Sequence, residues 1–221
     1  MSDPTEIRVT DGSHDVLNIA AIDLADELLG PGLRGVVWVQ GCPFDCAGCV
    51  APSWIPFTPA RSWTPAALAA ALVRPGVTGL TFSGGEPMAQ AGGLAATIRA
   101  ARAACTAPAG LSLVCFTGYR LERLRADPPS PGVADLLAEV DVLIDGLYVA
   151  RRNDGRGLRG STNQRIHHLT GRLRPSGYDF ERRARTAEVR IYADRLRLVG
   201  IPPAGLLDAL EPAAPPEECA R

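Results

Sequence analysis

Short apolar runs alternate with segments of helical character through the first two thirds of the chain. Runs rich in β-branched residues predict strands at 14–23, 34–40, 77–82, 111–116 and 142–144. The segments between them predict helices at 64–73, 88–105, 119–125 and 133–140. Thr64 and Pro65 mark the start of the first helix, as an N-cap followed by proline in the first turn. Almost continuously apolar strands that alternate with helices indicate a mostly parallel sheet and an α/β fold, either an open doubly wound sheet or a complete or partial barrel.

The pattern changes after residue 150. Residues 151–188 are rich in Arg and Gly and poor in large apolar side chains, which favours a solvated loop, with a docking surface for an acidic partner as the alternative. A strand pattern returns at 189–199, and a helix is expected at about 203–210. The composition of residues 211–221 predicts a flexible tail. We therefore expect one domain over 1–210, with its core at about 15–170, and then the tail.

Unusual polar and glycine-rich segments directly follow several of the predicted strands. They are Gln40–Cys42, Ser83–Glu86, Thr117–Tyr119 and Asp145–Gly146. In parallel α/β sheets the carboxyl ends of the strands meet at one rim, where ligands bind. The sequence therefore predicts a single ligand site at this rim.

Three cysteines crowd into one of these segments. Cys42, Cys46 and Cys49 are spaced so that a short loop curls all three sulfurs around one site. A structural zinc ion takes four ligands, and a ferredoxin-type cluster takes four cysteines. Three thiolates on a 4Fe–4S cluster would leave one iron with an open position, as metal catalysis requires. The alternatives are a zinc site completed by His167 or His168, and buried thiols that bind nothing.

Composition narrows the chemistry further. The net charge is −1 and the pI about 6.3, so the overall balance does not point to nucleic acid or to an anionic membrane. All basic residues are Arg, which excludes Schiff-base chemistry on a lysine of this chain. The N-terminal segment lacks the apolar core of a signal peptide, and no apolar run reaches the roughly 18 residues of a membrane span. We expect a cytoplasmic protein with reduced thiols, in which Cys105, Cys115 and Cys219 pack as small hydrophobic residues.

Several motifs occur together in one order along the chain. The cysteine loop is followed by Trp54, Ser83–Pro87, Phe116–Tyr119, Asp141–Gly146 and Arg159–Arg165. This set resembles the radical S-adenosylmethionine (SAM) superfamily. Within it, the chain is most similar to the activating proteins of anaerobic (class III) ribonucleotide reductase, which are close relatives of the pyruvate formate-lyase activating enzymes. The resemblance covers about residues 15–170.

The resemblance implies a fold, a reaction and partners. The fold is a partial (β/α) barrel of radical SAM type. The three cysteines would hold a 4Fe–4S cluster whose open iron binds the methionine part of SAM. Reductive cleavage of SAM then gives a 5′-deoxyadenosyl radical, which takes a hydrogen atom from a glycine of a glycyl radical enzyme. A reduced flavodoxin- or ferredoxin-like protein would donate the electron.

The resemblance also implies which side chains bind SAM. Ser83, Gly84, Gly85 and Glu86 would bind its amino group, although a tight turn is the ordinary reading of such a segment. The remaining positions implied for SAM are Thr117, Asp145, Ser161, Asn163 and Gln164. A cap on the following turn is the alternative role for the aspartate, and an ordinary polar loop is the alternative for the last three. Asp141 is expected at the surface.

One segment departs from the family pattern. Activating enzymes usually carry one more residue between the last cysteine and the tryptophan, with Asn at the second position, where this chain has Val50–Ser53. The loop beside the cluster is therefore altered, which leaves the hydrogen donor open. The sequence supports a glycyl radical enzyme activase, with two alternatives: a radical SAM enzyme acting on a small molecule or peptide, and a non-catalytic Fe–S or zinc protein.

Overall fold

The protein is described by a computed structural model that covers residues 16–107, 109–191, 196–203, 205–206 and 209. Its centre is a seven-stranded sheet in the order β3-β1-β2-β4-β5-β6-β7. The strands are β1 (Leu17–Asp26), β2 (Leu33–Val39), β3 (Arg61–Trp63), β4 (Gly79–Gly84), β5 (Ser112–Thr117), β6 (Val142–Asp145) and β7 (Arg165–His168). Strands β2, β4, β5 and β6 run parallel, whereas β1, β3 and β7 pair antiparallel at the two sides.

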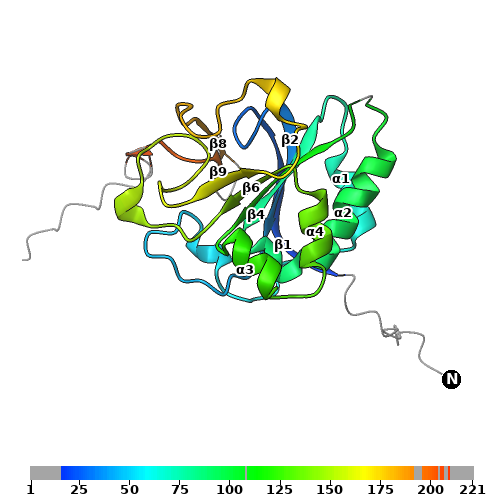
Figure 1. Cartoon of the computed structure of the whole chain (residues 1–221), viewed down its shortest axis with the longest axis horizontal. Coiled ribbons are helices and arrows are strands. Elements are labelled where there is room, and N and C mark those ends of the chain that lie inside the picture. The colour runs from blue at the N-terminus through cyan, green and yellow to red at the C-terminus, as the bar shows by residue number, and fades with distance from the viewer. Residues whose placement is uncertain (1–15, 108, 192–195, 204, 207–208, 210–221) are drawn as a thin grey trace, which may run out of the picture.

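The mixed α/β prediction with a parallel central sheet is therefore confirmed. The barrel form of that prediction is not, because the sheet stays open between β3 and β7. It is not doubly wound either, since the helices α1 (Pro65–Leu72), α2 (Ala91–Ala104) and α4 (Val133–Glu139) lie together on one face (Figure 1). The fourth helix, α3 (Leu121–Ala126), follows β5.

The main core lies between the sheet and these helices. Leu68, Leu94 and Leu136 of the helices belong to one buried cluster with Leu80 and Phe82 of β4, and all five are fully buried. Removing this much apolar surface from water is the main stabilising contribution in such a layer. The start of α1 agrees with its sequence, because Thr64 Oγ1 accepts a hydrogen bond from the Ala67 N–H at 3.3 Å. Within the described residues, no helix is long and apolar enough to cross a membrane.

The second face of the sheet is covered by the C-terminal third of the chain. Leu158 and Phe180 share a buried cluster with Ile144 of β6, while Val199 shares another with Trp38 of β2 and Ala21 of β1. Val199 belongs to a separate hairpin of β8 (Ala187–Ile191) and β9 (Leu196–Gly200), which pair antiparallel. The predicted single strand at 189–199 is therefore wrong, because the chain reverses within it. Part of the helix expected at about 203–210 and all of the tail at 211–221 lie outside the described residues.

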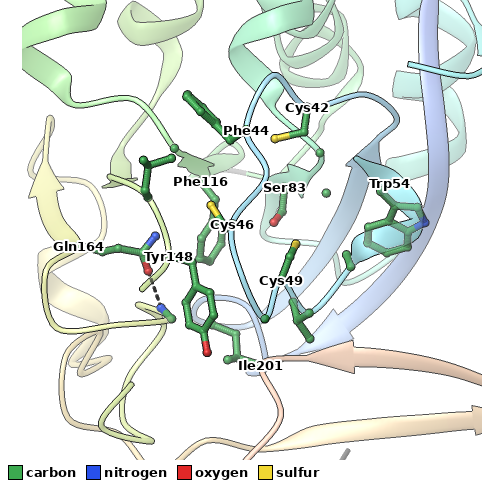
Figure 2. Close-up of a pocket in the computed structure, with 18 of the residues that line it drawn as sticks. Cys42, Phe44, Cys46, Cys49, Trp54, Ser83, Phe116, Tyr148, Gln164 and Ile201 are labelled. Atoms are coloured by element: carbon green, nitrogen blue, oxygen red, sulfur yellow. Dashed lines mark hydrogen bonds between the residues drawn. The ribbon is translucent and has the colours of Figure 1, made fainter. Parts of the chain in front are cut away.

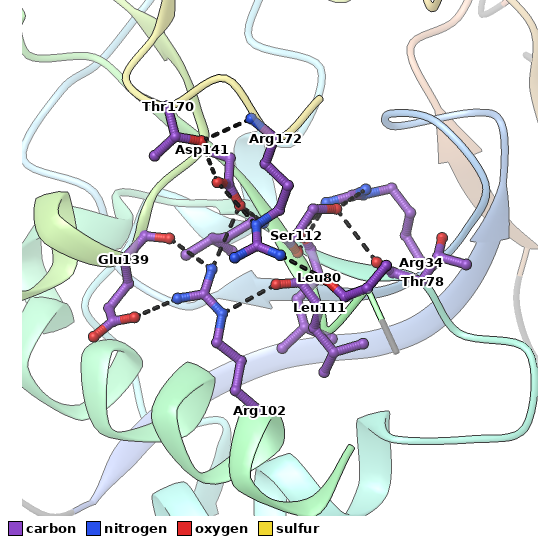
Figure 3. Close-up of polar contacts among 12 residues, drawn as sticks. Arg34, Thr78, Leu80, Arg102, Leu111, Ser112, Glu139, Asp141, Thr170 and Arg172 are labelled. Atoms are coloured by element: carbon purple, nitrogen blue, oxygen red, sulfur yellow. Dashed lines mark hydrogen bonds and ion pairs between the residues drawn. The ribbon is translucent and has the colours of Figure 1, made fainter. Parts of the chain in front are cut away.

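A charged network joins the amino ends of the parallel strands (Figure 3). Arg34, near the start of β2, is fully buried, and its guanidinium donates to Ser112 Oγ at 3.0 Å. Asp141, just before β6, is also buried and accepts a hydrogen bond from the Leu113 N–H at 2.9 Å. The expected surface position of Asp141 is therefore wrong. Arg102 of α2 pairs with Asp141 at 3.4 Å, so the network ties the helical layer to the edge of the sheet opposite to the motifs.

Candidate functional site

A cavity of about 370 Å³ opens at the carboxyl edge of the parallel strands. Its lining includes Cys42, Cys46 and Cys49, together with segments that follow β4, β5 and β6 (Figure 2). The predicted convergence of several strand ends on one rim is therefore observed. It follows from the register, because Val39, Gly84, Thr117 and Asp145 end neighbouring strands side by side.

Backbone hydrogen bonds fix the shape of the cysteine loop. The Gly41 N–H donates to the Trp54 carbonyl at 2.9 Å, and the Cys42 N–H donates to the Ile55 carbonyl at 2.9 Å. The Cys49 N–H closes a turn on the Cys46 carbonyl at 3.0 Å. The loop therefore presents its three thiols from a backbone that is already ordered on both sides.

The described lining offers no histidine that would complete a zinc site on the three thiols. They are unpaired, and in the described part of the lining no fourth cysteine and no histidine accompanies them. Among the described residues, no group of three or more Cys, His, Asp or Glu side chains, the three thiols included, is already arranged around a metal position. Burial raises the pKa of the Cys42 thiol to about 11 and also raises that of Cys46. Positive charge from bound iron would counteract this effect, because metal binding favours the thiolate.

Gly84 and Gly85 are required by the packing of the protein's own backbone. A Cβ on Gly85 would lie 2.2 Å from the Gly41 carbonyl oxygen, and one on Gly84 would lie 2.5 Å from the Val39 nitrogen. Gly84 also has a φ of +99°, which favours glycine. The two glycines thus hold the end of β4 against the cysteine loop. Together with Ser83, they also line the cavity.

Glu86 lines the cavity and has 1% of its surface exposed. Its carboxylate accepts hydrogen bonds from the Met88 N–H at 2.9 Å, the Thr117 hydroxyl at 2.9 Å and the Gly118 N–H at 2.8 Å. Burial raises the pKa of this carboxyl to about 7, against the opposing effect of these donors. The hydrogen bond between Glu86 and Thr117 therefore joins the ends of β4 and β5 at the cavity. Both residues were predicted to bind SAM.

Three residues of the loop after β6 were predicted to bind SAM, and only one of them, Gln164, lines the cavity. Gln164 lines the cavity, and its side chain bonds the Gly146 carbonyl at 2.6 Å and the Gly160 N–H at 2.7 Å. Ser161 is fully buried and accepts from the Val149 N–H at 3.1 Å, outside the lining. Asn163 donates to the Leu147 carbonyl at 2.8 Å and is likewise outside it.

Asp145 is engaged behind the cavity rather than in its lining. Its buried carboxylate accepts from the Leu121 N–H at 2.8 Å, from Arg120 at 3.0 Å, and bonds His167 Nε2 at 2.9 Å. Burial alone would raise the pKa of this carboxyl, but the hydrogen bonds from Leu121, His167 and Arg120 lower it. The side chain therefore bonds the first N–H of α3, which lies earlier in the chain, rather than the turn that follows Asp145.

Several lining residues were not among the residues predicted to bind the cluster or SAM. Phe44 and Tyr148 line the side near Cys46, and Phe116, from the end of β5, lies beside them (Figure 2). Arg185 and Ile201 come from the part of the chain that resembles nothing in the family pattern. The signals available in the sequence were the positions of Phe44 inside the cysteine loop and of Phe116 inside the Phe116–Tyr119 motif. The C-terminal lining depends on tertiary packing alone.

Comparisons with known proteins agree with this geometry. The sequence profile of a protein family described as "4Fe-4S single cluster domain" matches residues 28–167. The anaerobic ribonucleoside-triphosphate reductase-activating protein of Vibrio cholerae is 32% identical over 151 residues, which cover 66% of this chain and 94% of that protein. The protein of the same name from Escherichia coli K12 is 31% identical over 152 residues, covering 65% and 94%. That of Enterobacteria phage T4 is 29% identical over 158 residues, covering 68% and 93%.

Proposed function

The chain belongs to the radical SAM family of anaerobic ribonucleoside-triphosphate reductase-activating proteins, and from this premise we propose that it installs a radical on a glycine of a partner enzyme. The partner would be a glycyl radical enzyme of the ribonucleotide reductase or formate-lyase type. A reduced flavodoxin- or ferredoxin-like protein would supply the electron. The cofactors are a 4Fe–4S cluster and SAM.

One observation carries this proposal. Three thiols from a single short loop line the same cavity as the Ser83–Glu86 segment and Gln164. The cysteines would hold the cluster through three corners, and the glycine-rich segment and the Gln164 loop would hold the cosubstrate beside it. When bound, the cluster and SAM supply one-electron reduction and the abstraction of a hydrogen atom.

The residues of the chain itself prepare the site for this chemistry. Trp54 packs against Trp38 with 5.7 Å between ring centroids, and Phe44 packs edge-on against Tyr119 at 4.7 Å. These aromatic pairs surround the cysteine loop with apolar surface. Exclusion of water protects a reactive radical from side reactions, so an apolar lining is expected here. Gly118 allows the Phe44 ring to approach, because a Cβ there would lie 2.6 Å from it.

Electron paramagnetic resonance tests the proposal directly. We would reconstitute the full chain anaerobically, add dithionite and SAM, and incubate it with candidate glycyl radical enzymes. The expected result is a doublet radical signal on the partner that depends on SAM. Cleavage of SAM without a signal on any candidate would favour a small-molecule or peptide substrate instead. Iron binding with intact SAM would favour a non-catalytic iron–sulfur protein.

A further inference from the structure

One wall of the cavity is built by the end of the C-terminal hairpin. Arg185 and the segment 200–203 line the same cavity as the three cysteines. Figure 2 shows Ile201 just after β9, at the end of the cavity away from Cys42. These residues lie beyond residue 167, where the family match ends. The region that matches the family model therefore does not include this wall.

The hairpin is attached firmly to the sheet. Arg190 of β8 pairs with Asp23 and donates to the Leu24 carbonyl at 2.7 Å. Arg197 of β9 pairs with the same aspartate at 3.2 Å. Ile201 packs into the cluster of residues formed around Trp38 on the second face of the sheet. Ion pairs and apolar contacts therefore hold the wall in a defined place over β1 and β2.

Arg185 connects the wall to the opposite loop. Its side chain is only 2% exposed. The guanidinium donates to the carbonyls of Arg159 at 2.6 Å and Gly157 at 3.3 Å, and to Asn153 Oδ1 at 2.7 Å. A planar guanidinium satisfies several acceptors from one position, which lysine does not do. Arg185 is thus a positioning residue for the loop that leads to Gln164.

Apolar side chains that are open to solvent belong to the lining of this cavity. Val50 and Leu147 belong to the lining and are 56% and 42% exposed, respectively. Pro202 and Pro203 add apolar surface and have no backbone N–H to offer a ligand. Pockets of about 300–1,000 Å³ each accommodate one drug-sized ligand. A cavity of about 370 Å³ lies near the lower end of this range, so we expect a bound cosubstrate to leave room only for a narrow group.

We propose that Ile201, supported by Pro202 and Pro203, determines specificity by limiting the width of the substrate segment that reaches the cluster. The wall admits a polypeptide loop with small side chains and excludes bulky groups. This inference rests on the proposed function, because it assigns a selecting role to one wall of the same site. It adds that the selection is made by a segment outside the region that matches the family model.

Thiol labelling measures the width of the access without needing the partner. The full chain, without its cluster, is treated with iodoacetamide, which is small, or with fluorescein maleimide, which is bulky. Mass spectrometry of the peptide that contains Cys42, Cys46 and Cys49 gives both rates. Their ratio cancels the effect of the thiol pKa, since both reagents react with the thiolate. Ile201→Ala, Ile201→Trp and the control Ile191→Ala are compared with the wild type. Ile191 is 80% exposed on β8 and lies outside the lining.

Ile201→Ala should raise the bulky-to-small ratio by about five-fold, the change produced by removing about 1 kcal/mol of steric hindrance. Ile201→Trp should lower it, and Ile191→Ala should leave it unchanged. Thermal melting identifies any variant that fails to fold, in which case the other Ile201 variant decides. A ratio that stays at the wild-type value in a folded Ile201 variant overturns the inference. Failure of the proposed function would instead appear as intact SAM in the reduced, reconstituted wild type, whatever the labelling ratio.

Discussion

Gly85 is the point at which the cysteine loop and the end of β4 approach most closely, and Gly85→Ala perturbs this contact alone. The added Cβ would lie 2.2 Å from the Gly41 carbonyl oxygen, 2.7 Å from the Gly41 carbonyl carbon and 2.9 Å from the Trp54 carbonyl oxygen. All three are backbone atoms, so no side chain can rotate to relieve the overlap. The cysteine loop must move away from β4.

The expected loss of stability follows from two contributions. Overpacking in a close-packed region typically costs about 1–3 kcal/mol. Moving Gly41 also weakens the hydrogen bond from the Glu86 N–H to the Gly41 carbonyl, now 2.9 Å long, at about 1 kcal/mol. We therefore expect Gly85→Ala to lower the free energy of unfolding by about 3 kcal/mol. The same displacement should reduce the iron content of the reconstituted protein, since Cys42 directly follows Gly41.

Gly171→Ala is the matched control. A Cβ at Gly171 would meet no described atom within 4 Å, so this variant carries the same chemical change without the overlap. Urea denaturation would give the free energies of unfolding, and iron analysis would give the cluster content. If Gly85→Ala and Gly171→Ala agree within about 0.5 kcal/mol, the scale of an ordinary surface substitution, the reasoning about this contact is refuted.

Three further changes test other parts of the structure. Burial raises the pKa of the Glu86 carboxyl from 4.5 to about 7. As the pH rises, the unfolded chain therefore loses this proton at a lower pH than the folded chain does. The free energy of unfolding of the cluster-free chain should therefore fall by about 3 kcal/mol as the pH rises from 4.5 to 7. Urea denaturation at several pH values should show that this pH dependence is absent in Glu86→Gln. Arg34→Met removes a charged donor from buried acceptors and should cost about 3 kcal/mol by the same measurement, whereas Arg125→Met, at an exposed position, should change little. Arg185→Lys should speed hydrogen exchange in residues 153–160, because a lysine cannot satisfy the same acceptors; unchanged exchange would contradict the positioning role.

The sequence allowed much of the sheet and helix order to be predicted, because these elements are set by local pattern. Apolar runs such as 77–82 and 111–116 fall on β4 and β5 with shifts of one or two residues. The antiparallel strands β3 and β7 were missed because they span only three and four residues and lack an apolar run. Their pairing depends on neighbouring strands that the local sequence does not specify.

The candidate site was predictable where spacing carries the signal and unpredictable where tertiary packing does. The cysteine spacing and the glycines after β4 indicated the cavity, since both follow the end of a parallel strand. Asp145 shows the limit, because its sequence position does not reveal that Arg120 and His167 would approach it. Ile201 shows a second limit, since a residue outside every motif reaches the cavity only through the folding of the C-terminal hairpin over β2.

Cleavage of SAM by the reconstituted chain tests the central claim, that three cysteines hold a catalytic cluster. Wild type, Cys46→Ala and the control Cys105→Ala would be compared under dithionite, with 5′-deoxyadenosine measured by chromatography. Cys105 is a free cysteine outside the cavity lining. The wild type and Cys105→Ala should bind about four irons per chain and form 5′-deoxyadenosine, whereas Cys46→Ala should form none. Formation of 5′-deoxyadenosine by Cys46→Ala at the wild-type rate would contradict the account.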